Sequence, residues 1–560
     1  MTTTVPLTRT SPVDQIYPTL APAQVARIAA HGRPRRVEQG EVLVQPGERP
    51  AHFFLVVAGR IDVIRPAEGA EELVVSFGPG MFTGEATMLS GRRGLAQIRA
   101  GAPGEVIEVN RDDLLALIQT DGELSEILMR AFILRRVELI ARGVGDVVVL
   151  GSSHCQGTLR VREFLTRNGH PYTSLDLDHD PGVQELLDHF QVRPADVPVV
   201  ICRGDVVLRN PTNQLIAECL GFNDAIDQTK IRDVVIVGGG PAGLAAAVYG
   251  ASEGLDVLVV ESNAPGGQAG GSSRIENYLG FPTGISGQEL AERAYTQAQK
   301  FGAQVVIAEH ATRLACDRKP YAIEIGNRGA GGQRVPARTV IIATGAQYRR
   351  LPIDSLARFE GAGVYYAATF MESQLCAGDE VVVVGAGNSA GQAAVFLAQT
   401  ARRVHMVIRS EGLAETMSRY LIRRIEDHPG IVRHLRTDIV SLEGNGHLER
   451  VGWRDNQTGR VETHAVRHVF AMTGAVPSTR WLGGCLALDA KGFIKTGPDL
   501  SPEDLAAARW PLARAPHLLE TSLPGVFAIG DVRAGSLKRV ASAVGEGSIA
   551  VAAVHRVLAE

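Results

Sequence analysis

A glycine-rich turn between a strand and a helix constrains this 560-residue chain more than any other feature. The segment DVVIVGGGPAGLAAAVYGASEGLDVLVVES contains an apolar strand, the spacing Gly238-x-Gly240-x-x-Gly243, a helix, and a second strand that ends at Glu261. Gly238 permits a tight turn, Gly240 lets the backbone approach a pyrophosphate, and Gly243 lets helix and strand pack closely. The helix N-terminus offers N–H groups to phosphates. We therefore predict a dinucleotide-binding βαβ unit in which Glu261 accepts hydrogen bonds from a ribose.

A second glycine-rich turn lies further along the chain, in DEVVVVGAGNSAGQAAVFLAQTARRVHMVIR. Gly385 and Gly387 again join a strand to a helix. The position that corresponds to Glu261 is Ile408, with Arg409 beside it. No acid is present there to hold a ribose 2′-hydroxyl, whereas Arg409 can pair with a 2′-phosphate, which favours NADPH over NADH. The alternative is that Arg409 is a solvated surface arginine.

The chain as a whole falls into three styles of sequence. Short β-like runs split by glycines end near residue 110, and apolar residues then recur at helical spacing from Arg111 to Arg142, which predicts a β-roll closed by helices. A β-α-β unit with a hairpin and a last helix follows. From Ile231 onward strands and helices alternate, as in parallel sheets. The predicted fold class is multidomain, with a β-roll, an α/β unit and two Rossmann-like α/β domains. The expected boundaries are 15–142, 145–222, a linker at 223–230, 231–350 with 481–560, and 351–480.

Composition narrows the classes of function. The chain has 57 basic and 61 acidic residues, a formal charge of −4, which gives no electrostatic reason to expect nucleic acid or an anionic membrane as a partner. The N-terminus lacks an apolar signal segment, and no apolar run is long enough to span a bilayer. Six cysteines are too few for a disulfide scaffold, and none forms a CxxC pair. We expect a soluble, cytoplasmic protein without a metal site.

Further motifs carry a resemblance to a known family. PGGQAGGSSRIENYLGFPTGISGQEL, TVIIATGA and GVFAIGDVRAGSLKRVASAVGEGSIA match, in order, the flavin-side segment, the ATG crossover and the C-terminal flavin motif of thioredoxin reductases. Residues 230–560 therefore resemble that family. The resemblance implies FAD on the first glycine-rich turn, NADPH on the second, and a homodimer. It also implies rotation of one nucleotide domain against the other, with hinges near Thr344 and Gly474.

The same resemblance implies which residues hold the two cofactors. One polar contact differs, because Val540 stands where the family has glutamine. The implied FAD contacts are Gly238, Gly240, Pro241, Ala242, Gly243, Glu261, Gly267, Gln268, Asn277, Thr344, Gly345, Gly530, Asp531, Arg539, Val540 and Ala541. The implied NADPH contacts are Gly385, Gly387, Asn388, Ser389, Ala390 and Arg409.

The chain departs from this family at the redox centre. The family carries Cys-Ala-Thr-Cys-Asp before its pyridine-nucleotide strand, and residues 367–371 here read Ala-Ala-Thr-Phe-Met. Without a thiolate, no local dithiol can receive the electrons. Phe370 either covers the flavin face or fills the space of a cysteine. The nearby Cys376 is interpreted as a packing residue, and Glu372 either replaces the missing acid or is a solvated turn carboxylate.

The N-terminal β-roll resembles a cyclic-nucleotide-binding domain. GPGMFTGEATMLSGRRGLAQIRA is similar to its phosphate-binding cassette, in which Gly84 and Glu85 match the pair whose acid holds a ribose hydroxyl. The arginine expected at the cyclic phosphate falls on Gly94, so Arg92 and Arg93 are out of register and lose bidentate geometry. One interpretation is a cyclic-nucleotide site. The other is a β-roll kept for dimerisation or for contact with the reductase.

The middle α/β unit resembles a thioredoxin or glutaredoxin domain. Pro198 matches the cis-proline that faces the active site of that family. Cys155 matches the nucleophile at a helix N-terminus, where thiols ionise more readily, and Thr158 stands where a dithiol form has its second cysteine. Cys155 is the candidate catalytic residue, as a monothiol, and a vestigial site is the alternative. Cys202 or Cys219 would resolve it only if the fold brings one of them near.

Three functions are consistent with these features. The first is an NADPH-dependent disulfide reductase in which electrons pass from FAD through Cys155 to a thioredoxin-like partner or another disulfide; tethering the thiol module raises its effective concentration. The second is a thiol-independent flavin reductase that delivers electrons to a carrier protein, a quinone or a small oxidant. The third is a regulatory protein in which flavin and nucleotide binding report a redox or ligand state.

Overall fold

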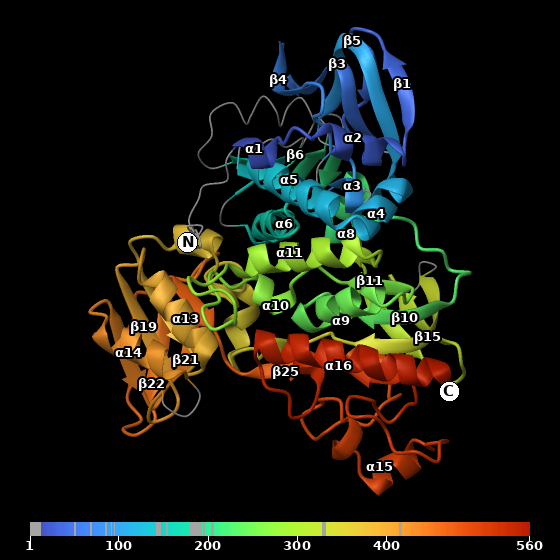
Figure 1. The fold of residues 1–560 in the computed structure, drawn as a ribbon. Coiled ribbons are helices and arrows are strands. Elements are labelled where there is room, and N and C mark those ends of the chain that lie inside the picture. The colour runs from blue at the N-terminus through green and yellow to red at the C-terminus, as the bar shows by residue number, and fades with distance from the viewer. Residues whose placement is uncertain are drawn as a thin grey trace, which may run out of the picture.

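The computed structural model describes residues 13–49, 52–67, 70–84, 87–90, 92–94, 96–141, 147–152, 155–177, 193, 196–202, 206–326, 332–413 and 417–560. Glu85, one of the two predicted cassette residues, lies outside these ranges. Figure 1 shows the N-terminal sheet at one end of the molecule, a small α/β unit beneath it, and two larger α/β domains beyond. The second of these, drawn in orange, lies to the side of the first.

The N-terminal β-roll is an antiparallel sheet closed by helices. Its elements are α1 (Val13–Ile16), α2 (Pro22–Ala29), β1 (Arg33–Val37), β2 (Val42–Val44), β3 (His52–Ala67), β4 (Ala70–Phe77), α3 (Thr87–Ser90), β5 (Gln97–Asn110), α4 (Arg111–Thr120) and α5 (Gly122–Ala141). The strand order is β1-β5-β3-β4, and β2 pairs with β5. Phe53 and Phe82 are tilted against each other, and both pack edge to face against Phe132 of α5, which closes the roll. The predicted roll and closing helices are present.

The middle unit comprises β6 (Val147–Gly151), α6 (Gln156–Arg167), β7 (Thr173–Asp176), β8 (Val199–Cys202), β9 (Val206–Arg209) and α8 (Asn213–Leu220). Its sheet has the order β7-β6-β8-β9, with β6 and β7 parallel and the other pairs antiparallel. The peptide bond between Val197 and Pro198 is cis. Residues 223–230, the predicted linker, form no helix or strand.

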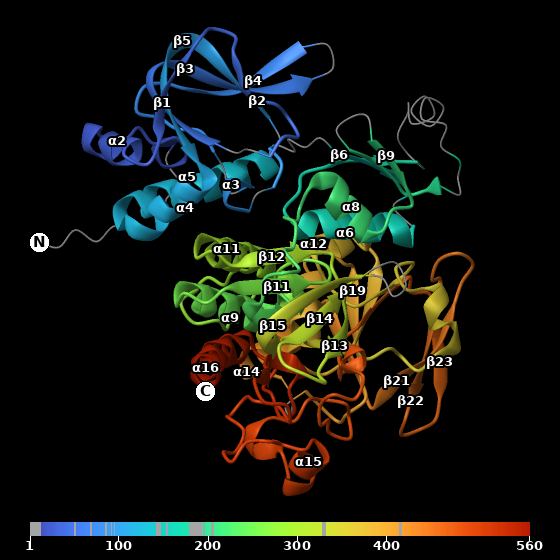
Figure 2. The same cartoon turned by 90° about the vertical axis from the view of Figure 1, so that its right-hand side faces the viewer.

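The central domain contains the first glycine-rich turn. Its elements are β10 (Arg232–Val237), α9 (Pro241–Ser252), β11 (Val257–Glu261), α10 (Gly267–Gly270), α11 (Gly287–Lys300), β12 (Gln304–Ile307), β13 (Ala311–Ala315), β14 (Tyr321–Ile325), β15 (Gln333–Ile342), β26 (Val526–Ala528) and α16 (Val540–Ala559). The sheet order is β12-β11-β10-β15-β14-β13, and β26 pairs with β15. Strands β10 and β11 are buried along their length, as strands covered on both faces must be. Figure 2 shows α9 and α16 together on one side of this sheet.

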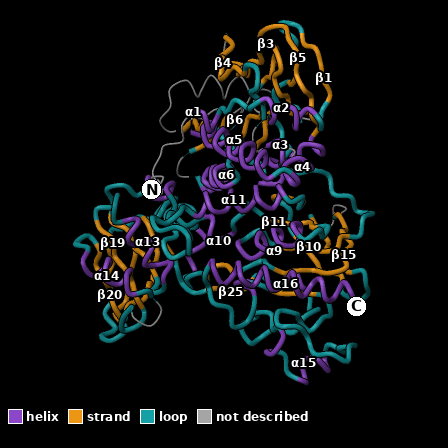
Figure 3. The backbone as a smooth tube through the Cα atoms, in the orientation of Figure 1, coloured by secondary structure: helices purple, strands orange, loops and turns teal. Residues whose placement is uncertain are grey.

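The outer domain contains the second glycine-rich turn. Its elements are η2 (Asp354–Arg358), β17 (Val364–Tyr365), α12 (Phe370–Leu375), β18 (Glu380–Val384), α13 (Asn388–Leu397), β19 (Arg403–Ile408), α14 (Arg419–Asp427), β20 (Ile431–Leu435), β21 (Thr437–Glu443), β22 (Arg450–Asp455), β23 (Val461–His464) and β24 (His468–Ala471). The parallel sheet has the order β17-β24-β18-β19-β20, and β21-β22-β23 form a separate antiparallel sheet. Figure 3 shows this domain as a body beside the central helices.

Two antiparallel strands connect the central and outer domains. They are β16 (Ala346–Tyr348) and β25 (Ala475–Pro477). Gly345 and Gly474, which precede them, have φ of +64° and +63°, in the region that favours glycine. Because the two strands are antiparallel, Gly345 faces Ser478 and Gly474 faces Arg349, so the two glycines lie at opposite ends of this short crossover.

A covalent bond ties two distant parts of the central domain. Cys316 follows β13, and Cys485 follows the short helix η3 (Arg480–Leu482); the two form a disulfide that spans 169 residues of sequence. Beyond it, the chain forms η4 (Gly497–Asp499) and α15 (Pro502–Ala507). No helix among the described residues is long and apolar enough to cross a membrane.

Candidate functional site

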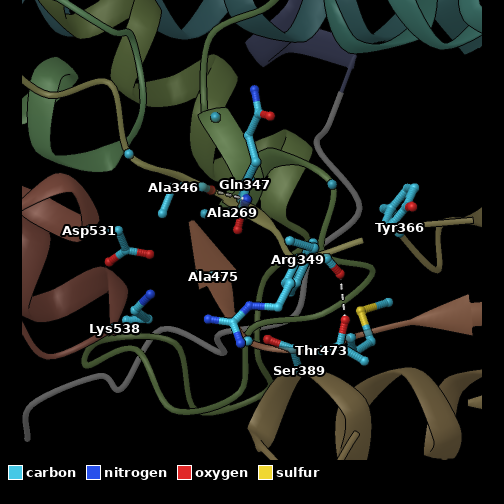
Figure 4. A pocket seen from close by; sticks show the side chains of 18 of the residues that line it. Ala269, Ala346, Gln347, Arg349, Tyr366, Ser389, Thr473, Ala475, Asp531 and Lys538 are labelled. Carbon is cyan, nitrogen blue, oxygen red and sulfur yellow. Dashed lines mark hydrogen bonds between the residues drawn. The ribbon is translucent and has the colours of Figure 1, made fainter. Parts of the chain in front are cut away.

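Both glycine-rich turns open into one hollow of about 2900 Å³. The central domain, the outer domain and helix α6 of the middle unit all line it. Figure 4 shows Asp531 and Lys538 on one side of this space and Tyr366 on the opposite side, with Ser389 and Thr473 below. The Thr473 hydroxyl donates to the carbonyl oxygen of Arg349 at 2.5 Å, so the two crossover segments are held together at the hollow.

The first glycine-rich turn is built as the sequence predicts. Gly238 has φ of +107°, and a Cβ placed there would lie 2.3 Å from the carbonyl oxygen of Ala343. A Cβ on Gly243 would lie 1.9 Å from the carbonyl oxygen of Gly238, so only glycine allows α9 to approach β10 this closely. Gly240, in contrast, faces open space, and its Cβ would reach only Gly267 Cα, at 3.9 Å. Pro241 and Ala242 begin α9 and line the hollow.

Glu261 ends β11 and is 6% exposed. Its carboxylate accepts hydrogen bonds from the backbone N–H of Gly239 at 2.6 Å and from that of Asn263 at 2.8 Å. It lies on the wall of the hollow. The acid is therefore held by two backbone donors and keeps further acceptor capacity for a ligand.

A segment at residues 265–271, a loop that contains the single-turn helix α10, covers the first glycine-rich turn. Gly266 donates from its N–H to the carbonyl oxygen of Gly239 at 2.7 Å. Gln268 bonds the carbonyl oxygen of Ala346 through its side-chain amide. Gly267, Gln268 and the more distant Asn277, which are predicted to contact FAD, all line the hollow. We call residues 265–271 the covering loop.

The C-terminal residues of the predicted FAD set lie opposite the covering loop. Gly530 donates from its N–H to Glu546 at 2.6 Å and has φ of +70°. Burial raises the pKa of Asp531, and the ammonium of Lys538 opposes this rise. Arg539 and Val540 line the hollow at the start of α16. Ala541, also predicted to contact FAD, is exposed and does not line the hollow.

The ATG segment lies where the two domains meet. Thr344 donates from its hydroxyl to the carbonyl oxygen of Ser478 at 2.9 Å, and Gly345 accepts from the Ser478 N–H at 3.1 Å. Both residues line the hollow. The motif thus fixes the crossover beside the first glycine-rich turn.

The second glycine-rich turn has the same construction. Gly385 has φ of +143°, and its Cβ would lie 2.5 Å from the carbonyl oxygen of Met472. Gly387 is the N-cap of α13, and a Cβ placed there would meet nothing within 4 Å. Asn388 accepts from the N–H of Ser418 at 2.7 Å. Arg409 follows β19, is exposed, and lines the hollow with Ser389 and Ala390.

The segment that replaces the family's dithiol lies between the two turns. Ala367 and Ala368 line the hollow, and a Cβ on Gly271 of the covering loop would lie 4.0 Å from that of Ala367. Glu372 accepts from the backbone N–H of Thr369 at 2.8 Å and also from its hydroxyl. This is the capping arrangement of a glutamate three residues after an N-cap. Burial raises the pKa of Glu372, so this side chain is not a solvated carboxylate. Its structural task is to cap the start of α12.

Phe370 and Met371 begin α12, but their side chains lie outside the described part of the structure. Cys376, at the end of this helix, is fully buried, and burial raises its pKa to about 12. A thiol with this pKa is not ionised near neutral pH and is inert. Cys376 is therefore a packing residue, as the sequence indicates.

Cys155 is the N-cap of α6 and is half-buried. A Cβ on Gly157 would lie 3.7 Å from the Cys155 sulfur and 2.7 Å from Cδ of Pro198, so the thiol and the cis-proline flank the same helical turn. Gln156 and Gly157 line the hollow, whereas Cys155 does not line it in the described residues. The thiol lies one residue behind the wall.

The register of the middle sheet decides one open question. Cys202 pairs with Val147 at the start of β6, whereas Cys155 follows the end of β6 at Gly151. The two cysteines are thus at opposite ends of the sheet, and Cys202 is not a resolving partner. Thr158, in the place of a second cysteine, is 1% exposed and packs under Gly151.

The two arginines of the predicted cassette make their contacts at the border between the β-roll and the middle unit. Arg92 is 7% exposed and donates to the carbonyl oxygen of Asn168, at the end of α6, at 2.9 Å. Arg93 donates to the carbonyl oxygen of Gly47 at 3.1 Å and packs against Gly221. Both side chains therefore have partners where the β-roll meets the middle unit, which is a structural reason for their offset from the cassette position at Gly94.

The glycine cradles fit the two dinucleotides that the sequence implies. The faces of Gly240 and Gly387 are open towards the hollow at helix N-termini, where a Cβ would stand between the backbone and a pyrophosphate. Basic side chains, among them Arg409 and Lys538, lie on the same walls. No group of three or more His, Cys, Asp or Glu in the described ranges is arranged to hold a metal ion.

The sequence missed the disulfide, because two cysteines 169 residues apart carry no local signal. It also missed the engagement of Arg92 by a distant helix, which depends on how separate domains pack.

Comparisons with known proteins agree with this geometry. Residues 232–547 match the family described as pyridine nucleotide-disulphide oxidoreductase, and residues 34–121 match a cyclic nucleotide-binding domain. A thioredoxin reductase of Bacillus subtilis is 31% identical over 335 residues, which cover 60% of this chain and 97% of that protein. NADPH-dependent thioredoxin reductase 3 of Arabidopsis thaliana is 31% identical over 372 residues, 63% of this chain and 65% of that protein. The crystal structure of thioredoxin reductase from T. acidophilum superposes with a TM-score of 0.51 and 27% identity, covering 59% of this chain and 99% of that one.

Proposed function

Because the chain belongs to the pyridine nucleotide-disulphide oxidoreductase family, we propose that it is a thioredoxin-reductase-like FAD enzyme that oxidises NADPH, fused to a cyclic-nucleotide-binding domain. The observation that carries this proposal is that both glycine-rich turns open into one hollow. Bound NADPH would supply a hydride, that is, two electrons together with one proton, and bound FAD would accept it and pass the electrons on. The protein's own part is to bind and orient the reacting groups.

The residues of the central domain are proposed to hold FAD. The N-terminus of α9 faces a pyrophosphate across Gly240, whose open face leaves room for it. Glu261 accepts from ribose hydroxyls. Asp531 and Lys538 lie on the wall opposite, where they bind polar groups of the ribityl chain. The covering loop closes the other side, and the proposed domain consists of residues 231–350 and 481–560.

The residues of the outer domain, proposed to span 351–480, are assigned to NADPH. The N-terminus of α13 at Gly387 faces its pyrophosphate. Arg409 follows β19 at the position where an NADH site would have an acid, and its guanidinium can pair with a 2′-phosphate.

Two glycine substitutions test these assignments separately. In Gly387→Ala the new Cβ meets no protein atom within 4 Å, so the folded chain accepts it and only a bound dinucleotide is displaced. We expect Gly387→Ala to keep its FAD and to lose flavin reduction by NADPH, and Gly240→Ala to lose FAD. Gly412→Ala, which is equally unobstructed but outside the hollow, is the control. Variants that all behave like the wild type would contradict the assignment.

The middle unit, residues 145–222, is proposed to be thioredoxin-like. Support comes from its strand order β7-β6-β8-β9 and from the cysteine at the N-terminus of α6, beside Pro198. The thiol group at that helix end is flanked by Pro198, and the wall of the hollow begins at the next residue. A disulfide is therefore the electron acceptor that we propose.

The chemistry at Cys155 balances as a two-electron exchange. Its thiolate attacks one sulfur of a substrate disulfide, an S–S bond forms to Cys155, and the other sulfur leaves as a thiol after taking one proton. The two electrons that originate in NADPH, with one further proton, then cleave the mixed disulfide and restore Cys155. The net reaction consumes NADPH, one proton and one disulfide, and yields NADP⁺ and two thiols.

A thiol-independent acceptor is the second candidate. Ala367 and Ala368 replace the thiols next to the covering loop, and no cysteine of the described residues lines the hollow. A quinone, a small oxidant or a carrier protein would then take the electrons directly. Turnover with such an acceptor that is unchanged in Cys155→Ser, together with no turnover of disulfides, favours this candidate.

For the β-roll we propose a role in contact with the reductase rather than in binding a cyclic nucleotide. The support is that Arg92, the cassette arginine, is buried against the middle unit. A binding measurement with cAMP and cGMP tests this, and tight binding of either would contradict it. The homodimer, the cytoplasmic location and the regulatory function stay predictions.

A further inference from the structure

The C-terminal end of α6 lies where three parts of the molecule meet. The β-roll contributes Arg92 and Arg136, and α11 of the central domain contributes Tyr295 and Gln288. Figure 1 shows α6 between α5 above and α11 below. A change at this helix end is therefore felt by the β-roll and by the central domain together.

Arg92 makes its contacts with both neighbours at once. One guanidinium nitrogen donates to the carbonyl oxygen of Asn168 at 2.9 Å, and another donates to the Tyr295 hydroxyl at 3.4 Å. The guanidinium carbon lies 4.5 Å from the ring centroid of Phe222 and 5.3 Å from that of Tyr295. Both distances are within the range of a cation–π contact. The side chain thus bridges the middle unit and the central domain.

The C-terminal end of α6 is a place where a positive charge is stabilised. The last carbonyl groups of a helix have no partner within the helix, and the helix dipole places negative charge there. Arg92 binds the carbonyl group of Asn168, and Arg136 binds that of Gly169, so two arginines of the β-roll satisfy this end of α6. Arg92 is 7% exposed in this position.

The same helix end holds the covering loop. Arg167, the last residue of α6, donates to the carbonyl oxygen of Gly267 at 2.5 Å. Gly267 is in close contact with Gly240, because a Cβ on Gly267 would lie 3.1 Å from Gly240 Cα. Asn168 also donates to the carbonyl oxygen of Asn263, which precedes the loop, at 3.3 Å. Fixing Arg167 and Asn168 therefore fixes the loop that faces the first glycine-rich turn.

We propose that Arg92 is a positioning residue for the covering loop, so that the β-roll sets the geometry of the flavin site from outside the central domain. The effect passes from Arg92 to Asn168, along one peptide unit to Arg167, and from its guanidinium to Gly267. The inference rests on the proposed placement of FAD between Gly240 and the covering loop. It assigns to the β-roll a task that needs no ligand of its own.

The junction can be weakened without detaching the β-roll. Arg49 and Arg111 both pair with Asp224 and hold the β-roll to the linker by contacts that do not involve Arg92. Arg92→Ala removes the donors and the cation–π contact, whereas Arg92→Lys keeps the charge at the helix end but loses the fork of donors. Arg99→Ala is the control, because Arg99 is a β-roll arginine that pairs with Glu71 on the surface.

The first measurement is hydrogen exchange of the flavin-free protein. We expect faster exchange in residues 263–271 of Arg92→Ala, with β10 and β11 unchanged, an intermediate rate in Arg92→Lys, and no change in Arg99→Ala. Unchanged exchange at residues 263–271 in a folded Arg92→Ala protein overturns the proposal. This readout does not depend on FAD.

The second measurement is made on the FAD-loaded protein. We expect Arg92→Ala to weaken FAD binding about tenfold, the scale of coupling between linked sites, and to alter the visible circular dichroism of the flavin. Arg167→Ala should do the same, and the double variant should be less than additive, because both act through one loop. Identical FAD affinity and spectrum in Arg92→Ala overturns the inference. A wild-type protein that takes up no FAD would instead overturn the proposed function.

Discussion

At the residue scale, the choice between NADPH and NADH depends on Arg409. This side chain is exposed at the wall of the hollow, at the place where an acid would bind the 2′-hydroxyl of NADH. A guanidinium–phosphate hydrogen bond contributes about 1.5–3 kcal/mol, less where solvent screens it. We expect Arg409→Gln to raise the KM for NADPH about tenfold and to leave that for NADH unchanged. Stopped-flow flavin reduction with both nucleotides measures this.

The matched control is Arg433→Gln, because Arg433 lies on the neighbouring strand β20 and pairs with Glu426 outside the hollow. An equal loss with NADPH and NADH in Arg409→Gln would contradict the role in nucleotide choice. It would show that Arg409 acts on the shared part of the two nucleotides.

Two histidines of the outer domain predict a dependence of stability on pH. His405 and His434 lie 3.0 Å apart between their ring nitrogens, and His405 also contacts Glu380 at 3.2 Å. Burial lowers the pKa of His434 to about 4, and burial also lowers that of His405. His434 is therefore neutral in the folded protein at pH 6, where an unfolded chain has begun to bind protons, and His405 shifts in the same direction.

Stability that depends on neutral histidines is complete above their ordinary pKa of 6.5 and is lost as the pH falls towards about 4. We expect the outer domain to lose about 1–2 kcal/mol between pH 7 and pH 5, after allowance for the partial exposure of His434. Thermal unfolding at these two pH values measures the loss, and His434→Gln should reduce it. Equal pH dependence in the variant would contradict the assignment.

At the scale of elements, the disulfide between Cys316 and Cys485 joins the end of β13 to the segment after η3. Cross-links over long loops restrict the unfolded chain and typically stabilise by about 2–4 kcal/mol. We expect Cys485→Ser, or addition of a reductant, to lower the unfolding free energy of the central domain by about that amount. Chemical unfolding with and without reductant measures it.

Peptide mapping of protein purified without reductant provides the control. It establishes whether the bond between Cys316 and Cys485 has formed, which needs checking because cytosolic thiols are normally kept reduced. Cys485→Ser in the presence of reductant should then unfold like the reduced wild type. A reductant effect that persists in Cys485→Ser would contradict the assignment to this bond.

Sequence alone predicts those elements whose requirements are local. The two glycine-rich turns, the strands beside them and the closing helices of the β-roll follow from glycine spacing and apolar periodicity. Arg92 shows where this stops, since its partners Asn168 and Tyr295 are 76 and 203 residues away. Long-range packing between domains has no local pattern. Ala541 is exposed although the motif predicts a contact with FAD, because the family motif fixes the turn and not each side chain.

At the scale of the whole molecule, the central and outer domains meet at β16 and β25, and α6 touches both. A Cβ on Gly361 of the outer domain would lie 2.7 Å from Cγ of Gln156, the residue after Cys155. The middle unit is joined to the central domain by a continuous buried cluster that includes Phe164, Phe222 and Val305. The helix that carries the thiol is therefore fixed to the central domain and faces the outer one.

This arrangement makes Cys155 the proposed exit for electrons that enter at NADPH. The most direct test is an anaerobic NADPH titration of the FAD-loaded protein whose Cys155 has first been converted to a mixed disulfide with thionitrobenzoate. Flavin bleaching and release of the coloured thiol are followed together. Cys155→Ser, treated in the same way, keeps the disulfide between Cys316 and Cys485, and so separates any electrons that this bond consumes.

We predict that the wild type takes up one more equivalent of NADPH than Cys155→Ser and releases one thionitrobenzoate per chain before the flavin stays bleached. The same uptake in both proteins, with the coloured thiol still attached to the wild type, would contradict transfer through Cys155. A flavin that NADPH does not bleach would contradict the NADPH oxidation itself.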